Sequence, residues 1–188
     1  MEVKDTIVSL LMETGRVGIE DLIDAMEAKG FFTAPCSGAH HLAHEGGLAE
    51  HSLNVFELML KIDLALKSNT ARDSIILCGI LHDLGKAGDY GKPNYVENYL
   101  KSGKISESKP FVTNPNLLYI PHEIRSIAIA ERYTSLTEEE EFAILYHNGM
   151  YSDLKYSYSG KETPLSLILH FADMWASRVT ENEGKEDE

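Results

Sequence analysis

The chain has 188 residues, of which 43% are hydrophobic and 25% are charged, and its formal net charge is −13. This length and composition suit a single globular domain with a substantial core. The acidic balance argues against a long nucleic-acid partner, and no apolar run approaches the roughly 20 residues that are needed to span a bilayer.

Two features of the sequence bear on the cellular compartment. The N-terminal residues lack the basic stretch and apolar segment of a secretory signal. The two cysteines, Cys36 and Cys78, form no disulfide framework, and Cys78 lies in an apolar run typical of a core. We therefore expect a cytoplasmic protein. The sequence carries no signal for an oligomeric state.

Apolar residues recur at helical spacing through most of the chain, which predicts an all-α fold. We expect one domain over residues 1–180, with short N-terminal helices within residues 1–30 and a core over residues 30–178. The acidic residues 181–188 are expected to form a frayed tail.

The first predicted elements are two short helices, at residues 2–13 and 19–29. A turn-rich segment, residues 30–47, separates them from a helix whose apolar positions recur at helical spacing over residues 48–62. His51 lies on that apolar stripe. We therefore expect His51 to face the core, one turn into its helix.

The next predicted helix, residues 71–83, is apolar almost all round, which indicates a central position in the fold. Gly85 is a suitable C-terminal cap. A long irregular region, residues 87–121, follows, and within it residues 95–100 and 109–113 can pair as a small β-hairpin. Because so long an excursion is more often functional than idle, we expect it to wall a pocket.

Helical periodicity resumes over residues 122–133 and 138–147. Thr137 and the glutamates after it provide a cap and an acidic first turn for the second of these helices. After a loop, the last helix begins at Pro164, a residue that suits the first helical position, and ends near Arg178.

A histidine and an aspartate, His82 and Asp83, are adjacent at the end of the central apolar helix. Burying such groups unpaired costs several kcal/mol, and a divalent metal is the most economical shared partner. His51 and Asp173, which lie in the apolar faces of two other helices, complete a mixed nitrogen–oxygen set. This set suits iron, manganese, cobalt, nickel, magnesium or zinc.

Two further histidines indicate a second ion. His122 begins one predicted helix and His147 ends another, so with Asp83 shared between the two ions they extend the site to a pair. Two metals a few ångströms apart can hold a hydroxide nucleophile and clamp a phosphoryl oxygen. Any one of these histidines alone is more often a hydrogen-bonded core residue than a ligand. His170 is interpreted in that way, as a support for the ligands around Asp173.

Three basic side chains are candidates for substrate contact. Lys86 follows the His-Asp pair by one turn, and it either binds phosphate oxygens or serves as a lysine favoured by the helix dipole. Arg125 has the same two interpretations, with the structural one slightly favoured, and His41 either lines the pocket or is exposed. We take Asp83 and Lys86 as catalytic candidates, and Lys86, His41 and Arg125 as substrate-binding candidates.

The residues around His51, 46–55, and the motif His82-Asp83-Leu84-Gly85-Lys86 resemble the HD-domain superfamily of metal-dependent phosphohydrolases. The resemblance covers about residues 30–178 and is closest to small single-domain members from bacteria and their phages. Its later stations are matched by three more segments, residues 121–123, 146–150 and 170–174.

The resemblance implies an all-α HD-domain bundle with metals held between helices. It implies a hydrolase that cleaves phosphoester bonds of nucleotides or their derivatives by attack of a metal-bound hydroxide, with Lys86 stabilising the developing charge. Pro121 and Glu123 stand where relatives carry glycine, which would alter the mouth of the site. The implied metal ligands are His51, His82, Asp83 and Asp173, with His122 and His147 for the second ion.

Two other functions stay open at this point. Some HD-fold proteins with the same order of ligands are di-iron oxygenases that cleave carbon–carbon or carbon–phosphorus bonds, and Lys86 does not distinguish the classes. A noncatalytic binding module could instead retain the metal for stability. The complete ligand set argues against that third function, because a decayed site usually loses ligands.

Overall fold

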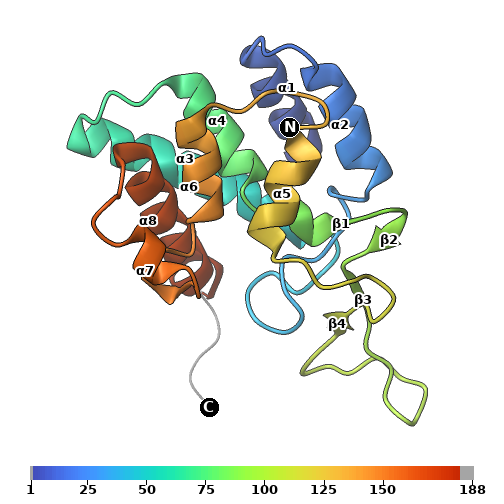
Figure 1. The fold of residues 1–188 in the computed structure, drawn as a ribbon. Helices are drawn as coiled ribbons and strands as arrows, with labels where there is room; N and C mark the ends of the chain where they lie inside the picture. The colour runs from blue at the N-terminus through green and yellow to red at the C-terminus, as the bar shows by residue number, and fades with distance from the viewer. Residues whose placement is uncertain (1, 183–188) are drawn as a thin grey trace.

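Helices dominate the computed structural model, which describes residues 2–182 (Figure 1). The expected all-α class is therefore confirmed. Among the described residues, no helix has both the length and the hydropathy that crossing a membrane requires. The helices are α1 (Val3–Glu13), α2 (Ile19–Ala28), α3 (Gly47–Leu66), α4 (Arg72–Leu81), α5 (His122–Ala130), α6 (Glu138–Leu145), α7 (Lys155–Tyr158) and α8 (Pro164–Arg178).

Helix α4 is the centre of the packing. Its residues from Ile75 to Leu81 are all buried, as expected for a helix that is apolar all round. Helices α3, α6 and α8 pack around it, and α3 also lies along α8 (Figure 1). The C-terminal end of α4 therefore lies in the middle of the helical bundle, and the His-Asp pair follows it directly.

Two glycines let neighbouring helices approach this end of α4. A Cβ atom at Gly79 would lie 2.8 Å from the Cα atom of Phe56 on α3, and one at Gly85 would lie 2.2 Å from the carbonyl oxygen of His122 on α5. Neither distance is possible for a real side chain, so only glycine permits these contacts. The two glycines thus let α3 pack closely on the last turn of α4, and α5 on the turn that follows the His-Asp pair.

The insertion between α4 and α5 contains the expected small hairpin. Strand β3 (Tyr95–Glu97) pairs antiparallel with β4 (Phe111–Thr113), with Val96 opposite Val112, and the hairpin projects away from the helices (Figure 1). A second short pair, β1 (Gly88–Asp89) with β2 (Lys92–Pro93), precedes it and has no counterpart among the predictions.

Asp89 anchors the base of this insertion to the helices. Its carboxylate accepts hydrogen bonds from Lys29 Nζ at 2.6 Å, from Arg132 Nη2 at 2.9 Å and from the backbone N–H of Tyr90 at 2.9 Å. Burial opposes the charged form of Asp89, but Arg132 and Lys29 outweigh it and lower the pKa of the carboxyl below its usual value. The side chain is therefore an anion held between two cations.

We expect Asp89→Asn to lower the free energy of unfolding at pH 7 by about 2 kcal/mol, because two partly buried cations lose their counter-charge. Since the folded pKa of Asp89 is depressed, its stabilisation is present above the unfolded value of about 3.9 and is lost as the pH falls through the folded value. Urea unfolding at several pH values measures this. The gap between the native protein and the variant should shrink below about pH 4, and a gap independent of pH would contradict the assignment.

Candidate metal centre

The chain leaves the α-helix immediately before the His-Asp pair. The expected helix over residues 71–83 ends at Leu81, two residues early, and a 3₁₀ turn, η1 (Leu84–Ala87), follows. Ser126 of α5 explains the change, because its hydroxyl donates to the carbonyl of His82 and accepts from the N–H of Gly85, both at 2.8 Å. This serine replaces helical hydrogen bonds, and neighbouring side chains that would diverge on a helix can point to one place.

All six candidate ligands converge on that place. The six side chains come from five helices or from residues at the ends of those helices. Four of them are almost fully buried: His51, His82, Asp83 and His147. No other part of the described chain brings so many imidazole and carboxylate groups together. The convergent residues are His51 on α3, His82 after α4, Asp83 before η1, His122 at the start of α5, His147 after α6 and Asp173 on α8.

One half of the centre lies between α3, α4 and α8. The Nε2 atom of His51 is 3.3 Å from Nε2 of His82 and 3.2 Å from Oδ1 of Asp173. The Oδ2 atom of Asp83 faces the same space, 3.5 Å from Nε2 of His51 and 3.6 Å from Nε2 of His82. Ligand atoms of His51, His82 and Asp83 lie within 4.8 Å of one another, and Asp173 joins this half through its contact with His51.

The other half uses the second oxygen of Asp83. Its Oδ1 atom is 3.1 Å from Nε2 of His122 and 3.6 Å from Nε2 of His147, and the two imidazole nitrogens are 3.3 Å apart. This Oδ1 atom is buried and makes no hydrogen bond within the described residues. A buried carboxylate oxygen without such a partner is a strong candidate for a metal ligand.

The orientation of the imidazoles also suits metal binding. The Nδ1 atom of His82 lies 3.0 Å from the carbonyl oxygen of Gly79, and Nδ1 of His147 lies 2.8 Å from that of Ile144. Because a carbonyl only accepts, each Nδ1 carries the proton and each Nε2 directs its lone pair into the centre. Metal-binding histidines are typically held in this way.

A model of the HD domain family matches residues 48–176 of the chain, a range that includes all six of these residues. The chain belongs to the HD-domain family. No curated protein and no solved structure gives a significant match. The family places the chain in a superfamily of metal-dependent hydrolases, and the buried histidine–aspartate cluster is compatible with a divalent metal site.

The charge states of His82, Asp83 and Asp173 in this HD domain also fit a cation. Burial lowers the pKa of His82 to about 3, so this imidazole is neutral. Burial opposes ionisation of both carboxyls. Lys86 outweighs it and lowers the pKa of Asp83, and the contact with His51 outweighs it and lowers the pKa of Asp173. Neutral nitrogens and ionised carboxylates are the ligand forms that a metal requires.

The structure places two of the three substrate-binding candidates beside the centre. Lys86 donates to Oδ2 of Asp83 at 2.6 Å, and the ring of His41 lies 5.1 Å from that of His51. Arg125 is buried and donates to the carbonyl of Leu118 at 2.8 Å, so in this structure it supports the end of the insertion. Substrate contact by these residues stays a prediction.

Two further side chains contact His147 in the second half. His170 lies with Nδ1 2.8 Å from the backbone oxygen of His147, which agrees with its expected supporting place. The side chain of Asn148, a residue that the sequence did not single out, lies 3.2 Å from Nε2 of His147. Asn148 belongs to the segment expected to be a loop, which also contains η2 (Gly149–Tyr151) and α7.

Glu181 is not among the site residues that the sequence predicts. The expectation of a frayed tail from residue 181 is wrong for Glu181. It lies in a 3₁₀ turn, η3 (Thr180–Asn182), and its side chain is only 1% exposed. Both of its carboxylate oxygens are 3.0 Å from Nδ1 of His51. An acidic segment without apolar periodicity gives no local signal for such a contact. The rest of the expected tail, residues 183–188, lies outside the described residues.

Proposed function

We propose that this HD-domain protein is a phosphohydrolase that binds two divalent ions and cleaves phosphoester bonds of nucleotides or their derivatives. The observation that carries the proposal is that the two carboxylate oxygens of Asp83 face different pairs of histidines. One of its carboxylate oxygens faces His51 and His82, and the other faces His122 and His147. A shared carboxylate between two histidine sets is the arrangement expected of a bridging ligand.

Two divalent ions would supply positive charge that lowers the pKa of a water molecule and neutralises phosphoryl oxygens. The chain's own contribution is to position that charge. Asp83 and Asp173 provide the anionic ligands, while the carbonyl contacts of His82 and His147 hold their rings in a fixed orientation. Lys86 adds a cation beside Asp83 that can contact a phosphate oxygen.

The substrate side of the centre is the His122 side. Its side chain is 29% exposed, whereas that of Asp83 is 1% exposed. A cavity of about 300 Å³ adjoins it and is lined by Tyr119 and Tyr151, two exposed aromatic side chains, and by Asn148. Aromatic faces and an amide suit a nucleobase, which supports a nucleotide over a simple phosphate ester.

The test is turnover by the full-length protein with Mn²⁺ and a panel of nucleotides, measured as release of phosphate or nucleoside. The double variant His82→Ala, Asp83→Ala is the control and should be inactive. Equal rates for the native protein and the double variant would exclude the proposal. Substrate-dependent oxygen uptake by the iron-loaded protein, without phosphate release, would assign the chain to the oxygenases instead.

A further inference from the structure

We propose that Glu181 is a positioning residue that holds and polarises His51, and that it strengthens metal binding selectively in the half of the centre formed by His51, His82 and Asp173. The inference rests on the proposed two-metal function. Glu181 lies beyond the matched range of the family model, which ends at residue 176. It is therefore a feature of this chain outside the matched HD domain.

Two side chains of α3, His51 and Asn54, contact the carboxylate of Glu181. Its two oxygens lie 3.0 Å from Nδ1 of His51, and Asn54, one turn further along α3, donates to Oε1 at 3.1 Å. The η3 turn that carries Glu181 is fastened to α8, because the amide of Asn182 donates to the carbonyl of Ser177 at 2.7 Å. Two helices thus fix the carboxylate against the imidazole.

The histidines of the centre differ in the group that contacts the Nδ1 atom of each ring. His82 and His147 face neutral backbone carbonyls, whereas His51 faces a buried carboxylate. His122 has Oε2 of Glu123 at 3.2 Å from its Nδ1 atom, with that side chain 11% exposed. A carboxylate makes the imidazole a stronger electron donor than a carbonyl does, so each half has one reinforced histidine.

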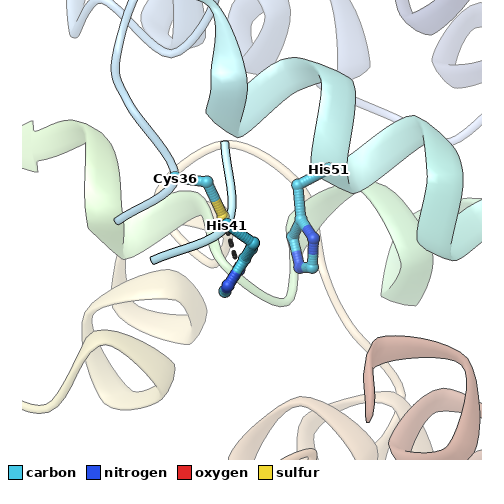
Figure 2. Close-up of side chains that lie close together, drawn as sticks. All are labelled: Cys36, His41 and His51. Atoms are coloured by element: carbon cyan, nitrogen blue, oxygen red, sulfur yellow. Dashed lines mark hydrogen bonds between the residues drawn. The ribbon is translucent and has the colours of Figure 1, made fainter. Parts of the chain in front are cut away.

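The surroundings of Glu181 direct its charge to His51. His41 is the other imidazole nearby, with Nε2 at 3.9 Å from Glu181, and it contacts the thiol of Cys36 at 3.3 Å (Figure 2). The carboxylate is closer to His51, at 3.0 Å from its Nδ1 atom, than to His41.

Cys36, His41 and His51 lie close together (Figure 2), but their contacts disfavour a separate metal site there. Both nitrogens of His51 are already engaged, Nε2 in the centre and Nδ1 with Glu181. Burial also raises the pKa of the Cys36 thiol to about 11, which disfavours the thiolate that a metal needs. His41 instead lies between its contact with Cys36, at 3.3 Å, and the Glu181 carboxylate, at 3.9 Å.

The experiment is a stepwise titration of the metal-free, full-length protein with Mn²⁺, followed by calorimetry or electron paramagnetic resonance. We expect Glu181→Gln to weaken one binding step by about 10- to 100-fold and to leave the other within about twofold. Glutamine keeps the shape and a hydrogen-bond acceptor but removes the charge. Glu181→Ala, which removes the acceptor as well, should weaken the same step further.

Glu123→Gln is the matched control, because it removes the carboxylate behind His122 in the other half. It should weaken the other step. If Glu181→Gln and Glu123→Gln weaken the same step, or if Glu181→Gln weakens neither, the inference is wrong. Asn54→Ala provides a second variant that leaves Glu181 and His51 in place. It should shift the same step as Glu181→Gln by a smaller factor, and an unchanged titration would count against the inference even if Glu181→Gln fails to fold.

These outcomes separate the inference from the proposed function on which it rests. A native protein that binds no divalent ion would overturn both. A native protein that binds two ions and hydrolyses nucleotides, with Glu181→Gln titrating identically, would overturn only the role of Glu181.

Discussion

Asp83→Asn is expected to lower phosphohydrolase activity by about 10³-fold or more and to reduce the number of bound ions. Within residues 2–182, Asp83 is the one residue whose two oxygens face different halves of the centre, Oδ2 at 3.5 Å from Nε2 of His51 and Oδ1 at 3.1 Å from Nε2 of His122. An asparagine offers one weaker oxygen donor and no charge, so it cannot serve both halves. Steady-state kinetics and elemental analysis of the metal content measure the two effects.

Asp173→Asn is the comparison that gives this prediction its specificity. Oδ1 of Asp173 is 3.2 Å from Nε2 of His51, and its carboxylate lies within 4.8 Å of ring nitrogens of His82 and His147. Among the described ion pairs it has none with His122. We expect this variant to retain one ion where Asp83→Asn loses affinity for both. Equal metal content in the two variants would contradict a bridging role for Asp83, and full activity of Asp83→Asn would contradict the two-metal proposal.

The sequence predicts the parts of the fold that depend on local pattern. The apolar stripe of residues 48–62 places His51 on a buried face of α3, and the fully apolar run becomes the central helix α4. Thr137 forms the capping interaction that its position before the glutamates predicts, accepting from the N–H of Glu140. These features follow from hydrogen bonds and burial within a few turns of chain, which is why they are readable without a structure.

The features that the sequence does not predict all depend on distant residues. Helix α4 ends early because Ser126, more than forty positions away, takes over its hydrogen bonds. Glu181 reaches His51 across 130 positions. His51, His82, Asp83 and Asp173 could be identified because each occupies an apolar context that does not suit it, whereas Glu181, an acidic residue in an acidic segment, conforms to its surroundings.

Lys86→Met is expected to lower kcat/KM for a phosphorylated substrate by about 100-fold while leaving the metal content unchanged. The ammonium group is 2.6 Å from Oδ2 of Asp83, and its side chain is 16% exposed, so it lies at the centre but can reach solvent. Burial opposes the charged form, yet Asp83 outweighs it and raises the pKa of Lys86. The lysine therefore stays a cation at any pH suitable for the assay, and methionine removes that charge with little change in length.

Lys92→Met is the matched control, because Lys92 donates to the backbone oxygen of Asn116 in the insertion and makes no contact with the six candidate ligands in the described structure. It should leave kcat/KM within about twofold of the native value. The metal affinity of Lys86→Met distinguishes a phosphate contact from a purely structural role for Lys86. If Lys86 only holds Asp83, its loss should reduce metal affinity, and added Mn²⁺ should restore the rate. If Lys86 binds the phosphate, excess Mn²⁺ cannot replace it, because the missing charge acts on the substrate and the carboxylate keeps its other partners.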